Sequence, residues 1–528
     1  MDSSERPGRG LPIKIGIGAA GLLALAGGVF LIREMAGPQL SLTGVKDGAV
    51  LNAAALKNLT VSVGSGSEAK QLKAMLNGRQ IDLTRSGSGF TLKLGELAEG
   101  AHELVVTAPG RLPLTGGTLS QRFRVDATPP RLQVPRTAEA RKLNGPFTFT
   151  GRAPDAARLT VDGRRVPLRK GGAFSISYQR PPDAVRLVAT DEAGNRTEQS
   201  VGVVVKHPPM RAVHVTGMAW ASPPLRDAVL KMAREGRINA IQLDIKDESG
   251  EVSYDSRVPL ARQIKATRTY YDARKTIDLL HGMNLQVVGR IVAFRDPILG
   301  KASWKAGKRD RLVRDAKGGA YDGGHYGNLS FTNLGDREVR QYNIDLAEEA
   351  ARLGFDDILY DYVRRPDGKL SSMRFPGLKG TPEDGIATFL ADTRRVVRPH
   401  GAFLGASVYG IAATRPLEIA QDMKKIGPYV DYVAPMVYPS HWGAGEFGLS
   451  NPNNAPFKVV NMSIRDFHKS LRGTNAQVIP WLQDFSLGKT YGVREVRAQI
   501  DGAKQAGSPS FLLWSPSVTY HAAALDRQ

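Results

Sequence analysis

From about residue 211 to its end, the chain alternates short apolar runs with amphipathic stretches of helical period, a pattern typical of parallel α/β domains. Eight apolar runs are predicted as strands, at residues 212–216, 240–246, 286–292, 357–363, 403–408, 432–438, 478–482 and 511–514. Helices are predicted between them, among others at 223–235, 272–283, 337–353 and 493–506. Eight such units predict a closed (β/α)8 TIM barrel over residues 208–528. A doubly wound sheet is disfavoured because no glycine-rich phosphate loop follows the first run.

Residues 38–207 show a different period, in which apolar and polar positions alternate as in half-buried strands. Strands are predicted at 59–63, 90–94, 102–107, 147–151, 157–161, 174–178 and 185–189. The paired prolines Pro129 and Pro130 interrupt strand pairing and divide the region into two all-β domains, 38–126 and 127–207. Asp162-Gly163 predicts a two-residue hairpin. The turn at 189–195 resembles one joining the last two strands of bacterial immunoglobulin-like sandwiches, so two such sandwiches are expected, with a spacing role.

The N-terminus contains eighteen uncharged residues, 15–32, a length close to that of a transmembrane helix. Arg6, Arg9 and Lys14 precede this run, whereas Arg33 and Glu34 nearly cancel behind it. The positive-inside bias predicts a cytoplasmic stub and anchor helix at 1–37, with the rest in the periplasm or cell exterior. A cleaved signal peptide is the alternative. Both interpretations place the bulk of the protein outside the cytoplasm.

Composition narrows the possible partners and chemistry. The chain carries 72 Lys and Arg against 51 Asp and Glu, a net charge of +21 that favours acidic partners. The basic residues are scattered and not interleaved with aromatics, so no nucleic-acid partner is expected. The absence of cysteine excludes disulfides, thiolate metal sites and a cysteine nucleophile. Without HExxH or GxSxG spacing, neither a metal, nor another cofactor, nor a serine nucleophile is expected.

Polar and aromatic residues gather where the predicted strands end, which is where TIM barrels carry their active sites. The candidates there are Asp244, Arg290, Asp361, Arg364, Tyr438, His441, Trp442, Trp481, Gln483, Asp484 and Trp514. Several acids beside indole and phenol rings suit a glycan, because sugar rings stack on aromatics and hydroxyls need many donors and acceptors. The predicted partner is therefore a polysaccharide or oligosaccharide.

The same segments carry a resemblance to a known family. Residues 243–250, 289–292, 355–365, 434–442, 480–485 and 513–514 resemble the bacterial "putative glycosyl hydrolase domain" family, TIM barrels distantly similar to the α-amylase type. The resemblance implies a glycoside hydrolase without implying its substrate. One departure lies at the fifth strand, where such proteins typically carry an Asp before Val-Phe-Gly and this chain has Ser407 before Val408-Tyr409-Gly410.

Glycosidic cleavage generally needs a proton-donating carboxylic acid and a second carboxylate. Asp361 is the first candidate, as nucleophile or charge stabiliser, with Arg364 as the cation that keeps it ionised; the alternative is a rim ion pair with Arg290 or Arg364. Asp484 is the expected second carboxylate and Asp244 the third, although each suits a rim salt bridge or helix cap equally well. Asp247 is expected to cap a turn.

Binding roles are expected for the remaining candidates. Trp442, Trp481 and Trp514 are predicted sugar platforms, although Trp514 also suits a core position, and Tyr438 and His441 are predicted hydrogen-bond donors. A long basic loop at 295–335 is expected to cover the mouth, hold an acidic sugar and present Asn333 to the site. Two functions remain open: an exported hydrolase of envelope or extracellular polysaccharide, and a catalytically impaired glycan-binding barrel, which Ser407 favours.

Overall fold

The computed structural model describes residues 40–57, 59–65, 71–109 and 116–527. Within those ranges no helix combines the length and apolarity that crossing a membrane requires. The predicted anchor at 15–32 lies outside the described residues.

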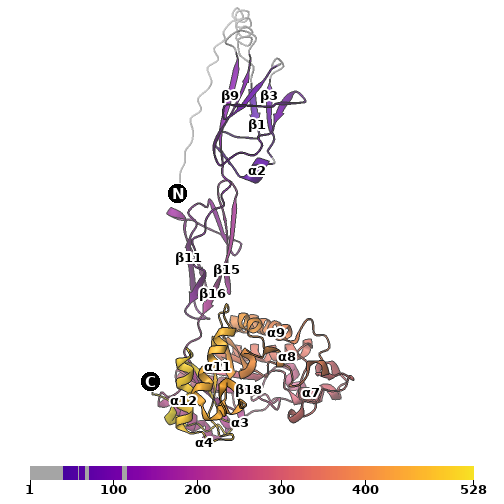
Figure 1. Cartoon of the computed structure of the whole chain (residues 1–528), viewed down its shortest axis with the longest axis vertical. Helices are drawn as coiled ribbons and strands as arrows, with labels where there is room; N and C mark the ends of the chain where they lie inside the picture. Colours follow the sequence, from indigo (N-terminus) through magenta and orange to yellow (C-terminus); the bar gives the residue numbers. More distant parts are fainter. Residues whose placement is uncertain (1–39, 58, 66–70, 110–115, 528) are drawn as a thin grey trace, which may run out of the picture. The chain divides into compact units, whose positions relative to one another are not determined.

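The first part of the described chain is β-rich, as predicted (Figure 1). One sheet has the order β1-β3-β7-β6 and the other β2-β9-β8-β4-β5. Their apolar positions alternate and bury a common core that includes Val61, Val63, Leu104 and Val106. The elements are β1 (Leu40–Thr43), β2 (Ala49–Leu51), α2 (Ala53–Lys57), β3 (Val61–Ser65), β4 (Lys73–Leu76), β5 (Arg79–Ile81), β6 (Thr84–Ser86), β7 (Gly89–Leu92), β8 (Gly100–Ala108) and β9 (Gly117–Val125).

A second β-rich region follows, with sheet orders β10-β16-β15-β12-β13 and β11-β14. Its strands are β10 (Thr137–Ala140), β11 (Phe147–Arg152), β12 (Arg158–Val161), β13 (Arg164–Val166), β14 (Ala173–Tyr178), β15 (Ala184–Thr190) and β16 (Arg196–Val205). The predicted hairpin is confirmed: Val161 pairs with Arg164, and both loop residues, Asp162 and Gly163, have positive φ. This is the conformation that a type I′ turn requires.

The C-terminal part is a closed parallel barrel, which confirms the predicted TIM-barrel architecture. Each strand pairs with the next, and β17 closes the ring against β27. The strands are β17 (Arg211–Val215), β18 (Ala240–Lys246), β19 (Gln286–Val292), β21 (Asp357–Asp361), β23 (Phe403–Tyr409), β24 (Tyr432–Met436), β25 (Gln477–Val478) with β26 (Trp481–Gln483), and β27 (Phe511–Trp514). The predicted seventh strand is thus interrupted, at Ile479 and Pro480, because proline cannot donate to the ladder.

Helices surround this barrel (Figure 1). They are α3 (Gly217–Ala221), α4 (Pro223–Arg234), α5 (Pro259–Gln263), α6 (Ala273–Gly282), α7 (Pro297–Lys305), α8 (Arg337–Leu353), α9 (Pro382–Val397), α10 (Met423–Ile426), α11 (Pro456–Ser470) and α12 (Val493–Gln505). Helix α8 has the predicted bounds because Asp336 caps its first turn and Gly354 ends it in the left-handed conformation.

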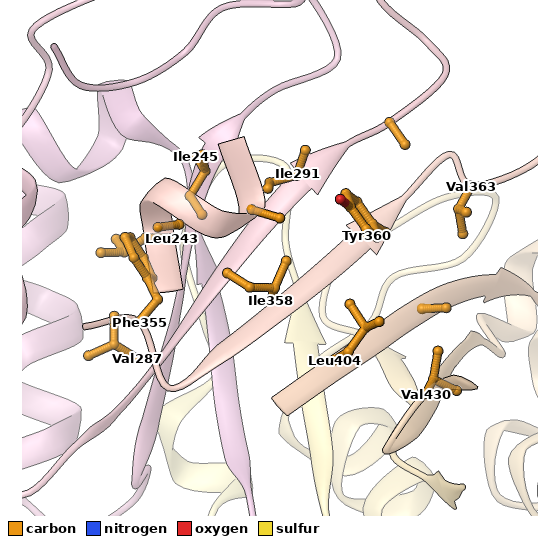
Figure 2. Close-up of a cluster of buried hydrophobic side chains, with 14 of the residues drawn as sticks. Leu243, Ile245, Val287, Ile291, Phe355, Ile358, Tyr360, Val363, Leu404 and Val430 are labelled. Atoms are coloured by element: carbon orange, nitrogen blue, oxygen red, sulfur yellow. The ribbon is translucent and has the colours of Figure 1, made fainter. Parts of the chain in front are cut away.

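The two faces of each barrel strand have different partners. Figure 2 shows outward-facing apolar side chains from four neighbouring strands, Leu243, Ile245, Val287, Ile291, Ile358, Tyr360 and Leu404. Burial of each such aliphatic side chain stabilises the fold by roughly 1.5–3 kcal/mol. The alternate positions belong to a separate buried cluster that includes Ala212, Val288, Leu359, Trp481 and Leu512. Since successive side chains point to opposite faces, this second cluster fills the barrel interior.

The connection after β19 departs in part from the predicted loop. It contains α7, whose N-terminus is capped by the Asp296 carboxylate accepting from Leu299 N at 2.8 Å. It also contains β20 (Arg314–Asp315), which pairs antiparallel with β22 (Met373–Arg374). The segment at 295–335 is therefore folded, and we call it the excursion. It is held by local capping and strand pairing, which leave no long periodic pattern in the sequence.

A buried ion pair lies at the amino ends of the strands. His207 Nε2 lies 2.6 Å from Asp357 Oδ2 at the start of β21, and neither side chain is exposed to solvent. Gln286 at the start of β19 donates to Asp357 Oδ1 at 2.8 Å. Burial favours the neutral imidazole, but the charges of Asp357 and Asp431 outweigh it and raise the pKa of His207.

The substitution Asp357→Asn is expected to destabilise the barrel by about 3 kcal/mol at pH 6, because it leaves a buried imidazolium without its counter-ion. The measurement is the denaturant midpoint of the barrel transition. Asp255→Asn is the control, since Asp255 pairs with Arg262 at a site where its side chain is 72% exposed, and should change stability by less than about 1 kcal/mol. Equal midpoints for Asp357→Asn and the wild type would contradict the assigned role.

The same pair makes this stability depend on pH. Folding raises the pKa of His207, so its protonation adds to the free energy of unfolding. This stabilisation is complete below the pKa of the unfolded state, about 6.5, and is lost as the pH rises through the pKa of the folded state. The difference in unfolding free energy between wild type and Asp357→Asn should therefore shrink as the pH rises above about 6.5. A difference that stays constant from pH 6 to pH 9 would count against a charged His207.

Candidate active site

A single guanidinium organises the carboxyl ends of the barrel strands. Arg290 on β19 donates through Nη1 to Asp244 Oδ1 at 3.0 Å and through Nε and Nη2 to Asp361 Oδ2 at 3.0 and 2.7 Å. Its Nη2 also bonds Glu248, in the loop after β18. Two predicted carboxylates, Asp244 and Asp361, are thus brought together, by Arg290 and not by Arg364.

Strand periodicity explains why these side chains meet. Asp244 lies opposite Arg290 in the β18–β19 ladder, and Val292 lies opposite Asp361 in the β19–β21 ladder. Asp361 is two residues after Leu359, which belongs to the interior cluster, so both point inward. The lower layers of the barrel are apolar, and the last inward layer carries the charges.

Asp244 is held as an anion deep in this layer. Its side chain is fully buried, and both its oxygens lie within 3.2 Å of His214 Nε2 on β17. Burial raises the pKa of Asp244, but His214 and Arg290 outweigh it and lower that pKa to about 2. A carboxylate so strongly held charged cannot donate a proton near neutral pH, which excludes Asp244 as the general acid in this arrangement.

Glu248, for which the sequence predicts no role, bonds the same Arg290 nitrogen as Asp361. A register shift between Asp244 and Lys246 interrupts the β18 ladder just before it. The Glu248 side chain is 29% exposed, against 9% for Asp361 and none for Asp244. Burial raises the pKa of Glu248 and Arg290 lowers it, with a net lowering. Glu248 is therefore the most solvent-accessible carboxylate of the three.

Indole rings form one wall of the charged layer. Trp514 stacks on His214 with ring centroids 4.1 Å apart, and the Arg290 guanidinium lies 5.2 Å from the Trp514 ring. Trp481 meets Trp514 edge to face at 5.7 Å and donates from Nε1 to Ser407 Oγ at 3.0 Å. Trp481 is 1% exposed, so it supports the wall from within. Trp514, which is half-buried, is the indole positioned to touch a ligand.

Asp484 has a partner of its own. His521 lies with Nδ1 2.5 Å from Asp484 Oδ1, and its backbone N–H donates to Oδ2 at 2.9 Å. The Asp484 side chain is buried, whereas that of His521 is 43% exposed. Burial raises the pKa of Asp484 against the lowering effect of His521. No described contact joins Asp484 to Asp361 or Asp244, so the predicted trio is only partly assembled.

The residues predicted after β24 and β26 fall into two groups. Tyr438 is buried, and its pKa is raised well above 10 by burial and by the charge of Asp361. Gln483 is fully buried and accepts from Ser440 Oγ at 2.8 Å, which ties the two strand ends together. His441 and Trp442 lie farther out: His441 is exposed, and Trp442 packs on Phe447 with centroids 4.6 Å apart.

Two predicted roles require correction. Asn333 does not face the charged layer; its amide nitrogen donates to the carbonyls of Asp310 and Pro376, and its oxygen accepts from Gly335 N, so it braces the excursion. Arg364 does not pair with Asp361; its Nη2 donates to Tyr409 Oη at 2.7 Å and Tyr326 Oη at 3.1 Å. Arg364 follows the end of β21 and the left-handed residue Tyr362, so its nearness to Asp361 in sequence does not bring the two side chains together.

A cavity of about 1080 Å³ lies elsewhere on the barrel, lined by residues around α6 and α8 that include Tyr254, Tyr271 and Glu349. It contains none of the Arg290-linked carboxylates. Tyr271 Oη nevertheless donates to the Asp244 carbonyl at 3.0 Å, which links that flank to the charged layer. We place the site by the chemistry of the strand ends and not by this cavity.

The closed parallel barrel, with its charged groups at the carboxyl ends of the strands, places the protein among TIM-barrel proteins. The model of the family described as "Putative glycosyl hydrolase domain" matches residues 212–520, more than half of the chain, and the chain belongs to that family. Membership implies a glycoside hydrolase in general and a carbohydrate substrate. No curated protein sequence matches the chain.

Several solved structures are similar to the chain at low TM-scores. A hypothetical protein from Ruminiclostridium thermocellum is 32% identical over 37% of this chain and 96% of its own, with a TM-score of 0.33. The PgaB (BpsB) glycoside hydrolase domain from Bordetella bronchiseptica is 15% identical over 59% and 95%, with a TM-score of 0.45. An α-galactosidase from Thermus thermophilus is 14% identical over 85% and 91%, with a TM-score of 0.39. At these TM-scores the likenesses place no residue of the site.

Replacing Arg290 by Gln is expected to destabilise the barrel by about 3–5 kcal/mol at pH 7, since it leaves buried carboxylates unpaired. The stabilisation due to lowered carboxyl pKa values is present above the unfolded value of about 4 and is lost as the pH falls towards about 2. The deficit of the variant, measured by denaturant unfolding, should therefore shrink below pH 4. An unchanged midpoint at pH 7 would show that Arg290 does not hold the cluster.

Proposed function

We propose that this protein hydrolyses O-glycosidic bonds of a polysaccharide at the carboxylates bound to Arg290. The observation that carries the proposal is the bonding of one guanidinium to Asp244, Asp361 and Glu248 at the carboxyl ends of the strands. Arg290 and His214 together carry at most two positive charges, which do not balance three carboxylates. The surplus negative charge suits an oxocarbenium-like transition state, which develops positive charge at the sugar ring.

Asp361 is the proposed nucleophile and Glu248 the proposed acid/base. Both bond the same Arg290 Nη2, so their oxygens lie at most two hydrogen-bond lengths apart, under about 6.4 Å. The net lowering of the Glu248 pKa opposes an acid role while Arg290 is bound. Substrate that takes over Nη2 would remove the hydrogen bond from Arg290, one of the contributions that lower the pKa of Glu248, while the charge of Arg290 remains.

Asp484 is the second candidate for the proton donor. Burial raises its pKa, which is the direction an acid catalyst needs, but its oxygens are occupied by His521. In this version the exposed imidazole of His521 passes the proton and Asp484 orients it, as a buried carboxylate orients a catalytic histidine. Substrates with activated leaving groups distinguish the two candidates, Glu248 and Asp484. Such substrates need no proton donor, so only the variant that lacks the true donor should regain activity on them.

The setting of the reaction is also proposed. We place the enzyme on the outer side of the cytoplasmic membrane, anchored by residues 15–32, with the two β-rich regions as immunoglobulin-like spacers over 38–126 and 127–207. The uncharged run and the basic residues before it support this placement. The substrate in this setting is an envelope or extracellular polysaccharide.

A glycan-binding barrel without turnover is the alternative, and Ser407 is the observation that favours it. Its hydroxyl is fully buried and accepts from Trp481, so no carboxylate occupies this position on β23. If relatives use an Asp there for catalysis, this chain keeps the aromatic wall and lacks that group.

Asp361→Asn is expected to lower hydrolysis of a responsive polysaccharide by at least about 10²–10⁴-fold, the range for loss of one catalytic group. Reducing ends released by the purified full-length protein from a panel of envelope and extracellular polysaccharides provide the measurement, with Asp255→Asn as an exposed-carboxylate control. Glu248→Gln or Asp484→Asn, whichever removes the acid, should keep activity on aryl glycosides with good leaving groups. Glycan binding with no turnover by the wild type would support the alternative function.

The short separation of Asp361 and Glu248 predicts retention of anomeric configuration, because retaining pairs are about 5–5.5 Å apart and inverting pairs about 6.5–9.5 Å. Proton NMR of the first-formed product identifies its anomer before mutarotation. An inverted first product would reject the Asp361–Glu248 pair and direct attention to a more distant carboxylate such as Asp484.

A further inference from the structure

A second charged cluster lies on the same rim, directly after Asp361. It consists of Arg295 beyond β19, Tyr362 and Arg364 beyond β21, Tyr409 at the end of β23, and Tyr326 from the excursion. Because β19, β21 and β23 are neighbours in the barrel, their carboxyl ends bring these residues together. We refer to these five residues as the tyrosine–arginine cluster.

Arg364 is the buried member, only 1% exposed. Its guanidinium carbon lies 4.5 Å from the Tyr409 ring centre and 5.0 Å from that of Tyr362. Its one described ion pair is with Asp367 at 3.4 Å, and the Asp367 side chain is 47% exposed. A long, water-accessible ion pair compensates little of the cost of burying a guanidinium.

Arg295 lies over two rings, those of Tyr326 and Tyr362, that Arg364 also contacts. Its guanidinium carbon lies 4.9 Å from the Tyr326 ring centre and 5.2 Å from that of Tyr362, and Nη1 donates to Tyr362 Oη at 3.1 Å. Among the described residues, no carboxylate lies within ion-pairing distance of Arg295. The guanidinium groups of Arg295 and Arg364 therefore contact the same two tyrosine rings, and the only described counter-ion of the pair is the distant carboxylate of Asp367.

The cluster also contains more hydrogen-bond donors than acceptors. Nε of Arg295 and Nε of Arg364 are buried and have no acceptor among the described residues. The hydroxyls of Tyr326 and Tyr409 are 3.2 Å apart, so one donates to the other and the second proton has no described acceptor. Arg364 Nη2 donates to both hydroxyls. A group with several anionic oxygens would complement these cations and the donors that they share with the tyrosine hydroxyls.

Backbone strain marks the same place. Tyr362 has φ 47°, a left-handed conformation that is rare for a bulky residue, and its N–H donates to Asp361 Oδ1 at 2.7 Å. This geometry turns the Asp361 carboxylate towards Arg290 while the Tyr362 ring lies between the two arginines. The negative layer and the positive cluster are thus joined by one peptide bond.

We propose that the tyrosine–arginine cluster binds an anionic substituent of the glycan, a carboxylate, sulfate or phosphate on the sugar next to the bond under attack. The inference rests on the proposed function, because it places this substituent beside Asp361. It makes an acidic polysaccharide the substrate class of the barrel. Tyr326, the member from the excursion, completes the site only because the excursion is folded against the strand ends.

The test measures binding without turnover, by affinity electrophoresis of the full-length protein. Polygalacturonate and alginate are each compared with their carboxyl-reduced forms, and dextran sulfate with dextran. At least one acidic polymer should bind at least about 10-fold more tightly than its neutral partner, and Arg295→Gln should remove about 10- to 100-fold of that affinity, the range for hydrogen bonds to charged groups.

Arg309→Gln is the matched control, an exposed arginine of the same excursion that stacks on Trp304 at 4.8 Å, and it should change affinity by less than about 2-fold. Equal binding of acidic and neutral forms, or equal losses in Arg295→Gln and Arg309→Gln, would overturn the proposal. If Arg295→Gln does not fold, Tyr409→Phe replaces it, with a several-fold loss expected and no loss overturning the proposal. Selective acidic binding in a protein whose hydrolysis survives Asp361→Asn would reject the proposed catalysis alone.

Discussion

The bonding of Arg290 to three carboxylates is the interaction on which the site depends. In an unfolded chain, Asp244, Glu248, Arg290 and Asp361 are hydrated, and they come from three separate segments of the sequence. Closure of the barrel removes much of that water, and only the mutual bonding of these groups makes the burial tolerable. The apolar side chains that pack between strands and helices therefore stabilise the barrel, whereas burial of the charged layer lowers its stability. Active sites are commonly located where a fold carries such a cost.

The aromatic residues determine the shape of the charged layer. Trp481 lies in the interior and is fixed by Ser407, and it supports Trp514 edge to face. Trp514 in turn stacks on His214, which holds Asp244. The aromatic wall and the charged layer are therefore connected by direct contacts. A change at Ser407 would affect Trp481 first, and through Trp514 and His214 it would affect Asp244. Gly405, on the same strand, leaves the room that the Tyr432 ring occupies: a Cβ there would lie 2.4 Å from that ring.

Most of the barrel could be predicted from the sequence because its strands are continuous apolar runs and its helices have strong periodicity. Three of the predicted strands, 240–246, 286–292 and 511–514, have the observed bounds. Asp244 and Asp361 could be predicted because the barrel has few strand ends, and only some of these carry a carboxylate. Glu248 and His214 were missed because their roles depend on contacts across strands, which no local pattern contains. The position of Arg364 could not be read from strand alternation, because β21 ends at Asp361 and the left-handed Tyr362 interrupts the alternation before Arg364.

The position of Ser407 does not decide whether this barrel is catalytic. The Arg290-bound carboxylates come from β18, its following loop and β21, and none of them has a described hydrogen bond or ion pair with a side chain of β23. What β23 does contribute is Tyr409, whose hydroxyl belongs to the tyrosine–arginine cluster. A carboxylate at position 407 would lie beside Trp481 and add a negative charge to a layer in which carboxylates already outnumber cations. In this chain the fifth strand therefore supports the aromatic wall and the positive side of the mouth, while the second and fourth strands carry the acids.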